Sequence, residues 1–395
     1  MRCLWLTRID PLPQNSGELI YSGRMIESFA RSGAELAVLC LANPDSTRRD
    51  GDVEDGVRWH LAPSAPRPPW RSVLSPLPNA AYRCAAPALR GRLEAMLAAG
   101  PWDLVVFDCL SVGWALPAVL SSTASGGRRP RMVYVSHNHE ETTRTRVARD
   151  SDGNPLKRAV LLSDARKAAL LERRLVNAAD LVTAIAPADR ALFAGARRGR
   201  PVVELPPGYG GRRLEQRAIT GATPRRVVMV GSYEWVAKQV NLREFTGAAA
   251  PAFAETGAEL TVVGNGGAFL DALRREFPSV AFTGRVDDVY PYMDRARMAV
   301  VPERLGGGFK LKALDYVFNR LPIAALDHAF EGMPLKDRES VLSFPDYRGL
   351  VGGILRAIDD LETLNRLQER AYAACAGRFE WASRGRTLAE AVATL

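Results

Sequence analysis

A loop rich in glycine and lysine carries the clearest chemical signal in the sequence. Residues 306–312 read GGGFKLK, after an apolar run typical of a buried strand and before a segment with helical spacing of apolar residues. Glycines let a backbone approach a ligand closely, and a helix N-terminus presents unpaired N–H groups and partial positive charge to an anion. Asp315, further into that helix, could accept hydrogen bonds from hydroxyl groups. The loop therefore predicts a site for a nucleoside diphosphate with its ribose.

Lysine is scarce in this chain, so the placement of each lysine is informative. Only six of the 53 basic residues are lysines, and two of the six, Lys310 and Lys312, fall in the loop. Lys238 lies shortly after Gly231, at another predicted strand-to-helix corner of the same half of the chain. We expect these three lysines to contact a diphosphate. The alternative interpretation is a flexible glycine turn with two solvated lysines.

A second candidate site follows an apolar run in the first half. His137 lies at the end of the predicted strand 132–135, and Asn138 and Glu140 follow it. In this position His137 could contact a donor sugar or an acceptor nucleophile, whereas the alternative is a histidine that only hydrogen-bonds within the fold. The facing loop, whose backbone N–H groups could meet a phosphate or an acceptor hydroxyl, is expected to be formed by Asn15, Ser16 and Gly17.

The elements that must position these residues repeat a strand–helix pattern in two halves. Apolar runs predict strands at 3–7, 35–41, 104–107, 132–135 and 181–185, and again at 227–230, 260–263, 280–282, 298–301 and 323–326. Helical spacing predicts a first helix from residue 18 to about 32 and a long basic helix over 157–179. Two such halves indicate two doubly wound α/β domains, with ligands bound beyond the carboxyl ends of the strands, in a cleft between the domains.

The motifs resemble those of glycosyltransferase family 4, retaining enzymes of the GT-B fold that include many bacterial polysaccharide sugar transferases. The similar segments are 134–140 (YVSHNHE), 179–184 (ADLVTA), 206–208 (PPG), 283–286 (TGRV), the glycine–lysine region 302–322, and 379–381 (FEW). The resemblance implies an α/β protein of GT-B fold, with two Rossmann-like domains facing across a cleft. Residues 1–208 would form the acceptor-side domain together with a C-terminal helix at about 379–395. Residues 209–224 would be the linker, and 225–378 the nucleotide-sugar domain.

The resemblance and the loop together assign site residues. Catalytic roles fall to His137, Lys312 and Asp315, with Asp315 orienting ribose or sugar hydroxyls. Contacts to the donor nucleotide or diphosphate fall to Gly231, Lys238, Gly264, Arg285, Val286, Gly306, Gly307, Gly308, Phe309, Lys310 and Leu311. The acceptor side comprises Asn15, Ser16, Gly17, Asn138 and Glu140. The expected reaction moves a sugar from a nucleoside-diphosphate sugar to an acceptor hydroxyl, with retention. No cofactor or metal is implied, because the lysines and the helix terminus can neutralise the diphosphate.

The chain departs from the family pattern at five positions. The usual pair of glutamates, eight residues apart, falls on Gly307 and Asp315, and the threonine of the glycine-rich branch is Phe309. In the first strand loop of the second half, Ser232 stands where many members have arginine, and Lys238 lies one residue past the usual lysine. These departures keep open a non-catalytic partner protein or a sugar-nucleotide epimerase on the same fold.

The net charge of +9 is confined to one half of the chain. Residues 1–222 hold 31 basic and 22 acidic side chains, whereas residues 223–395 are neutral. This excess favours an anionic or lipid-linked acceptor and peripheral contact with the inner membrane face. It is not interleaved with aromatic residues, so nucleic-acid binding is not expected. Five cysteines without paired spacing, and the lack of a run typical of a signal peptide or membrane span, predict a cytoplasmic protein. The Gly264-Asn265-Gly266 cluster does not complete a dinucleotide fingerprint, because position 269 is Phe269.

Overall fold

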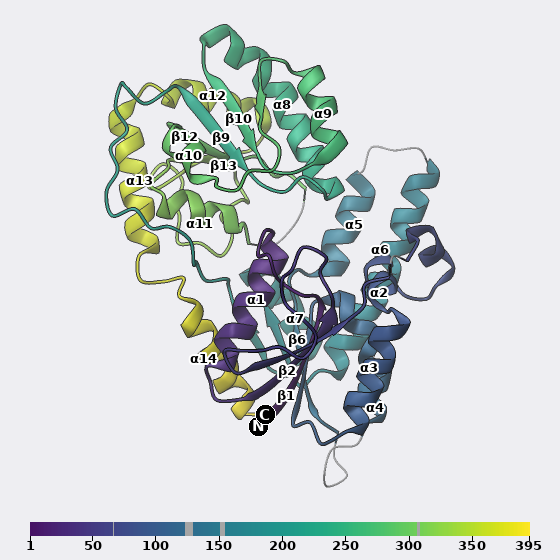
Figure 1. Cartoon of the computed structure of the whole chain (residues 1–395). Helices are drawn as coiled ribbons and strands as arrows, with labels where there is room; N and C mark the ends of the chain where they lie inside the picture. Colours follow the sequence, from purple (N-terminus) through teal and green to yellow (C-terminus); the bar gives the residue numbers. More distant parts are fainter. Residues whose placement is uncertain (66, 123–128, 151–154, 306–308) are drawn as a thin grey trace. The chain divides into compact units, whose positions relative to one another are not determined.

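The computed structural model describes residues 1–65, 67–122, 129–150, 155–305 and 309–395. Within it the chain forms two compact units, Met1–Gly208 with Glu380–Leu395, and Tyr209–Phe379 (Figure 1). Each unit is built on one sheet, parallel but for one short edge strand in the first unit, with helices on its faces, as the two runs of apolar strands and amphipathic helices predict.

The sheet of the first unit has eight strands in the order β3-β4-β2-β1-β5-β6-β7-β8. All pairs are parallel except β3 with β4. The strands are β1 (Arg2–Ile9), β2 (Glu35–Leu41), β3 (Val53–Glu54), β4 (Val57–Ala62), β5 (Leu104–Asp108), β6 (Arg131–Val135), β7 (Leu181–Ala184) and β8 (Val202–Glu204). Alternate residues of β1 enter opposite layers: Leu4 and Leu6 join the core on one face, and Trp5 packs against Phe29 on the other, with 5.7 Å between ring centroids.

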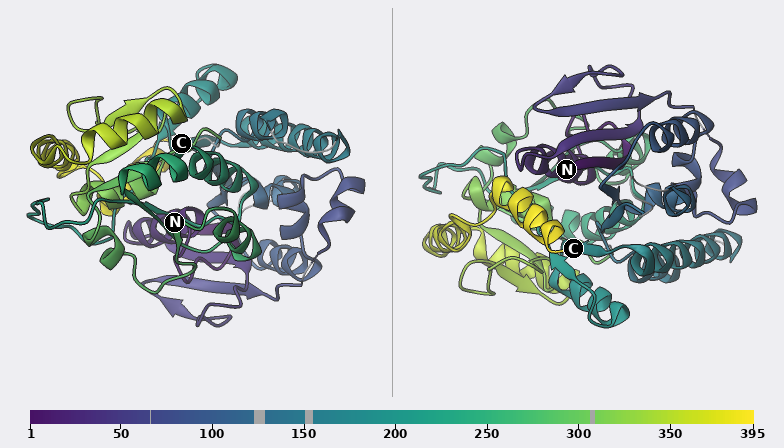
Figure 2. Two further views of the ribbon diagram at one scale, coloured as in Figure 1. Left: turned by 90° about the horizontal axis from the view of Figure 1, so that it is seen from above. Right: turned by 90° about the horizontal axis from the view of Figure 1, so that it is seen from below.

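The helices of the first unit cover both faces of this sheet. They are α1 (Gly17–Ala30), α2 (Asn79–Cys84), α3 (Pro87–Ala98), α4 (Leu116–Ser121), α5 (Glu140–Asp150), α6 (Pro155–Ala178), α7 (Pro187–Arg197) and α14 (Trp381–Ala393), with the 3-10 helices η1 (Pro69–Leu74) and η2 (Leu110–Ala115). The C-terminal α14 runs beside α1 (Figures 1 and 2). Gly385 permits this close approach, since a Cβ there would lie 2.2 Å from the carbonyl oxygen of Ser28.

The sheet of the second unit has six strands in the order β11-β10-β9-β12-β13-β14, all parallel. The strands are β9 (Arg226–Val230), β10 (Glu259–Val263), β11 (Ala281–Phe282), β12 (Met298–Val301), β13 (Ile323–Leu326) and β14 (Leu342–Phe344). The helices are α8 (Val236–Thr256), α9 (Gly267–Glu276), α10 (Tyr290–Asp294), α11 (Leu311–Phe318), α12 (Tyr347–Ala357) and α13 (Leu361–Cys375). Separate apolar clusters fill the two faces of the sheet, so β9, β12 and β13 are buried on both sides.

The segment 209–224, expected to be a linker, is packed within the second unit. Tyr209 stacks on Phe318 of α11 at 4.6 Å between ring centroids. The Arg217 guanidinium donates hydrogen bonds to the carbonyl oxygens of Met293, Asp294 and Ala296 at the end of α10. The change of unit therefore lies at Gly208–Tyr209 rather than along a free connection.

Candidate functional site

Three lysines and one buried glutamate gather at the carboxyl ends of β9 and β12 in the second unit. Lys312, in the first turn of α11, forms an ion pair with Glu303, which follows β12 and is buried. Lys310 is the N-cap residue of α11, and Lys238 lies in the first turn of α8. The structure thus brings together the three lysines that the sequence singled out, and adds Glu303 as their common partner.

Electrostatics show how closely these charges are coupled. Burial alone would raise the pKa of Glu303, but the positive charges of the lysines, Lys312 foremost, lower it below its ordinary value. Burial lowers the pKa of Lys238, and the neighbouring Lys312 and Lys310 lower it further. The three ammonium groups interact with the buried Glu303, and Lys238 interacts also with Glu234, so positive charge is still in surplus at the start of α11. A bound diphosphate would relieve that repulsion.

The chain that leads into the glycine loop is held by α8. The buried Asn241 donates from Nδ2 to the carbonyl oxygen of Leu305 at 2.8 Å, and its Oδ1 accepts from the backbone N–H groups of Arg304 and Leu305 at 3.1 and 2.8 Å. Gly306, Gly307 and Gly308 lie outside the described residues. The flanks of the loop are therefore set by Asn241 on one side and by α11, which begins at Leu311, on the other.

Three glycines line the sheet edge beside the lysines. A Cβ on Gly264 would lie 1.7 Å from the carbonyl oxygen of Gly231, and Gly264 has a φ of +130°. The N–H of Gly264 donates to the carbonyl oxygen of Gly284 at 3.0 Å. Arg285 and Val286 follow; Arg285 is exposed and Val286 packs partly against the core. These predicted donor contacts thus share one edge of one sheet.

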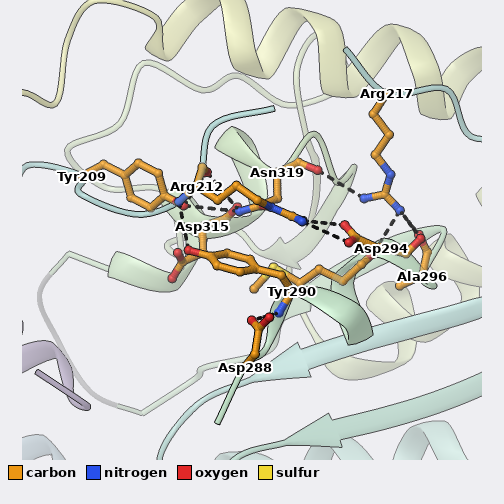
Figure 3. Close-up of polar contacts among 10 residues, drawn as sticks. Tyr209, Arg212, Arg217, Asp288, Tyr290, Asp294, Ala296, Asp315 and Asn319 are labelled. Carbon is orange, nitrogen blue, oxygen red and sulfur yellow. Dashed lines mark hydrogen bonds and ion pairs between the residues drawn. The ribbon is translucent and has the colours of Figure 1, made fainter. Parts of the chain in front are cut away.

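Asp315 lies in a polar network formed with the segment that follows Gly208 (Figure 3). The Tyr209 hydroxyl lies beside the Asp315 carboxylate and the Tyr290 hydroxyl, and the Tyr290 hydroxyl accepts from the backbone N–H of Arg212 at 2.9 Å. Burial raises the pKa of the Asp315 carboxyl to about 6, and a hydrogen bond with Tyr209 opposes that rise. The carboxyl is therefore largely ionised at neutral pH and able to accept hydrogen bonds from hydroxyl groups.

Phe309, expected to contact the donor, packs within the second unit. Its ring packs against Phe379, with 5.8 Å between centroids, and belongs to the margin of the apolar core. The side chain thus anchors the end of the glycine loop by burial, which explains why an apolar residue can stand where the related branch has threonine. This packing gives Phe309 a structural role, and its contact with the donor stays a prediction.

The first unit carries a buried histidine–aspartate pair. His137 Nε2 lies 2.7 Å from Asp108 Oδ1, and Trp5 Nε1 donates to Asp108 Oδ2 at 3.1 Å. Strands β1, β5 and β6 are neighbours in the sheet, so Asp108 at the end of β5 meets the residues that flank it on both sides. Burial alone would lower the pKa of His137, but the charge and hydrogen bond of Asp108 raise it above its ordinary value. Asp108 thereby favours the protonated form of His137, and it orients the ring by accepting from Nε2–H.

Aromatic packing holds the His137 ring. Tyr21 of α1 contacts it edge-on at 5.1 Å between centroids, and Trp381 of α14 contacts Tyr21 at 5.8 Å. Tyr21 is fixed in turn by donating its hydroxyl hydrogen to the carbonyl oxygen of Leu205 at 2.9 Å. Within the described part of the chain no group hydrogen-bonds to Nδ1 of His137, so this nitrogen can accept a hydrogen bond from a substrate when the ring is neutral and donate one when it is protonated.

Strained backbone follows Asp108. Cys109 has φ +73° and ψ 166°, a region that residues other than glycine rarely adopt. Its N–H donates to the carbonyl oxygen of Val135 at 3.0 Å, which ties the end of β5 to the end of β6. The strain is thus located where the histidine–aspartate pair is formed.

The residues after His137 are held by a buried carboxyl group on α6. Glu172 Oε1 and Oε2 accept from the backbone N–H groups of Glu140 and Glu141 at 2.9 and 3.0 Å, which caps the N-terminus of α5. The Ser136 hydroxyl donates to the carbonyl oxygen of Asn138 at 2.7 Å. Asn138 and Glu140 thus shape the loop next to His137.

Glu172 predicts a pH-dependent stability. Burial raises the pKa of Glu172 to about 8, against the two backbone hydrogen bonds, so the folded state retains a proton that the unfolded chain releases at about pH 4.5. Between these values the folded state binds more protons, and stability should therefore fall as pH rises from about 5 to 8. We expect Glu172→Gln to flatten this fall when melting temperature is measured across that range. An unchanged slope would show that Glu172 does not titrate there.

The N-terminal loop is used largely for helix capping. Ser16 is the N-cap of α1, and its hydroxyl accepts from the N–H of Leu19 at 3.5 Å. Gly17 is the first residue of α1, and the N–H of Asn15 donates to the carbonyl oxygen of Pro13 at 2.8 Å. Of these three residues, the N–H of Asn15 is therefore already paired within the fold, and it is not one of the groups left for a phosphate.

Two residues of these sites were missed by sequence reasoning. Asp108 follows the predicted strand 104–107, and an acid directly after an apolar strand was the available signal. Glu303 stands two residues beyond β12. Its burial could not be inferred from its own residue type, because charged side chains are usually exposed.

The described residues offer neither a cluster of metal ligands nor a membrane-spanning helix. They contain no group of three histidine, cysteine, aspartate or glutamate side chains arranged to hold a metal ion. They also contain no helix that is both long and apolar enough to cross a bilayer.

Comparisons with known proteins agree with this architecture. A model of "Glycosyl transferase 4-like domain" matches residues 16–208, and a model of "Glycosyl transferases group 1" matches residues 224–360. No curated protein sequence matches the chain significantly.

Solved structures match the whole chain in fold. Sucrose-phosphate synthase from Thermosynechococcus elongatus is 16% identical with a TM-score of 0.76, covering 100% of this chain and 98% of the other. WaaG, a glycosyltransferase involved in lipopolysaccharide biosynthesis, is 17% identical with a TM-score of 0.67 and 99% coverage of both chains. Anabaena Alr3699/HepE in complex with UDP-glucose is 15% identical with a TM-score of 0.64 and full coverage of both. The chain therefore belongs to the glycosyltransferases of GT-B fold and resembles those of family 4.

Proposed function

We propose that this enzyme transfers a sugar from a nucleoside-diphosphate sugar to an acceptor hydroxyl, with retention of anomeric configuration and without a metal ion. The observation that carries the proposal is the gathering of Lys238, Lys310 and Lys312 around one buried carboxylate at the N-terminus of α11. A structure of the same fold holds UDP-glucose, which supports a sugar nucleotide as the donor class.

The lysine cluster suits a diphosphate leaving group. As the glycosidic bond breaks, the diphosphate gains negative charge and the anomeric carbon gains oxocarbenium character. Cations and N–H groups already in place stabilise that charge in the transition state more than in the ground state. Glu303 holds Lys312 in position, so little reorganisation is needed when the charge develops. Asp315 accepts from ribose or sugar hydroxyls.

The first unit contributes His137 to the reaction. Its ring is buried, Asp108 raises its pKa, and its Nδ1 is not used by the fold in the described part of the chain. Such a group can hydrogen-bond to a donor-sugar hydroxyl or to an acceptor oxygen. The positive excess of this half favours an anionic or lipid-linked acceptor, and the enzyme is proposed to act in the cytoplasm.

A panel of sugar nucleotides tests the proposal. The purified chain is incubated with uridine, guanosine and deoxythymidine diphosphate sugars and candidate acceptors, and release of nucleoside diphosphate is measured with and without a chelator. We expect release with at least one donor, undiminished by the chelator, and a product whose anomeric configuration by NMR matches that of the donor. Inversion would overturn retention, and loss of activity on chelation would overturn metal independence.

The same panel separates the two alternatives. Binding of nucleoside diphosphate without turnover, for every acceptor tried, would identify a non-catalytic partner protein. Appearance of an epimeric sugar without an acceptor would identify an epimerase. The departures at Ser232, Gly307 and Phe309 are the reason to include both outcomes.

A further inference from the structure

One surface of the first unit combines exposed apolar side chains with positive charge. It is formed by η1 and by the outer face of α6, and we refer to it as the η1–α6 surface. Seven of the thirteen large apolar side chains that are exposed among the described residues lie on these two elements: Trp70, Val73, Leu74, Leu156, Val160, Leu162 and Leu170. Leu74 is 86% exposed and Leu156 is 73% exposed. Such a concentration marks an interaction surface.

The two elements present these side chains next to each other. Leu156, Val160, Lys167 and Leu170 are spaced by four, seven and three residues, so they share one face of α6. On that face the Lys167 ammonium donates to the carbonyl oxygens of Ser72 and Val73 of η1, both at 2.9 Å. The interaction joins η1 to the outer face of α6, whose opposite face packs into the core through Ala168 and Leu175 (Figure 1).

The exposed charges on the η1–α6 surface are all positive. Arg71 of η1 and Arg166 and Arg174 of α6 are exposed. Arg173 is exposed as well, but it forms an ion pair with Glu141. The two acids of α6 are used internally: Glu172 is buried at the start of α5, and Asp164 accepts from the N–H of Asn79 at 2.6 Å. No acidic side chain of η1 or α6 is therefore exposed to offset the arginines.

Two other arginines of this half form ion pairs within the fold. Arg129 forms an ion pair with Asp180 at 2.7 Å, and Arg144 forms ion pairs with Glu140 and Asp164. These arginines belong to the positive excess seen in the sequence but contribute little to an external surface. The η1–α6 surface is where positive charge and exposed apolar groups coincide.

We propose that the η1–α6 surface binds the anionic face of a lipid bilayer, with Trp70, Val73 and Leu74 entering the interfacial region and the arginines contacting headgroups. Tryptophan and leucine on a basic surface suit this boundary, where apolar insertion and attraction to anionic lipid act together. A second copy of the chain fits less well, because a two-fold contact would place the arginines of one copy against those of the other.

Membrane binding by this surface does not depend on the transfer reaction. It rests on the proposed function only in its biological use, which would be to bring the enzyme to a lipid-linked acceptor. Vesicle binding is measured without donor or acceptor. Failure of this inference and failure of the proposed function are therefore distinguishable.

Vesicle flotation with the full chain tests the proposal. Vesicles of phosphatidylcholine with about one third phosphatidylglycerol are compared with phosphatidylcholine alone. We expect binding only to the anionic vesicles, weakened when salt rises from about 0.1 M to about 1 M, which shortens the Debye length from about 10 Å to about 3 Å. The double variant Trp70→Ser/Leu74→Ser should reduce the partition coefficient at least about tenfold, because two apolar side chains no longer leave water.

Matched variants separate this surface from general effects. Leu120→Ser/Leu192→Ser removes two exposed leucines of α4 and α7 and should leave vesicle binding unchanged. Arg71→Gln/Arg166→Gln/Arg174→Gln should weaken binding and reduce its salt dependence. The proposal is overturned if the chain does not bind anionic vesicles, or if both double variants bind as the parent does. Self-association that Trp70→Ser/Leu74→Ser abolishes, without vesicle binding, would assign the surface to a second copy instead.

Discussion

Replacing Lys312 with alanine is expected to lower the rate of sugar transfer by a factor of about 100 to 1,000, the effect typical of losing one preorganised group that stabilises transition-state charge. The ammonium group lies at the N-terminus of α11, with Lys310 and Lys238 beside it, and is oriented by Glu303. Its loss removes a cation where the departing diphosphate gains charge. The measurement is kcat for nucleoside diphosphate release with a saturating acceptor.

The ion pair complicates this variant, because alanine leaves Glu303 buried without its partner. An unpaired buried charge is strongly destabilising. The double variant Lys312→Ala/Glu303→Gln removes both charges and should recover much of the melting temperature lost in Lys312→Ala, but none of the activity. Lys336→Ala is the matched control, since Lys336 is an exposed lysine of the same unit. Activity within a few-fold of the parent in the folded double variant would refute the role assigned to Lys312.

Asp108→Asn is expected to lower kcat by about 100-fold while leaving the affinity for nucleoside diphosphate unchanged. Asparagine keeps the shape of the side chain and can still accept from Trp5, but it removes the charge that favours protonated His137. Burial is then opposed only by the smaller effects of Glu18 and Glu140, so the pKa of His137 should fall. Transfer that depends on cationic His137 is present below the pKa of His137 and lost as pH rises through it. The alkaline limb of the pH–rate profile should therefore move to lower pH in Asp108→Asn.

A double-mutant cycle distinguishes this role from a merely structural one. If Asp108 acts through His137, then His137→Ala should reduce kcat by a similar factor, and the double variant should be scarcely worse than either single one. NMR titration of the imidazole gives the pKa of His137 directly. An unchanged pKa and pH profile in Asp108→Asn, or additive losses in the cycle, would show that Asp108 does not position His137.

The strands and helices that hold both sites could be predicted from the sequence because their apolar patterns are local. Strands β1, β2, β5, β6 and β7 in one unit, and β9 to β13 in the other, lie where apolar runs predict them. The strands that were missed, β3, β4, β8 and β14, stand toward the edges of the two sheets. Strands near an edge bury less surface, so their sequences contain shorter and weaker apolar runs. Whether such a segment becomes a strand depends on the neighbouring strand with which it pairs.

The sequence by itself determined which residues could bind a diphosphate, since the glycines, the lysines and the start of the helix follow one another directly along the chain. It also located the positive excess in the first half of the chain. Only the tertiary structure decided which distant groups complete each site. Glu303 meets Lys312 because β12 and α11 are packed on one sheet, and Asp108 meets His137 because β5 and β6 are neighbours. Whether two buried charges interact depends on the distance between them in the folded protein, and this distance cannot be inferred from their spacing along the chain.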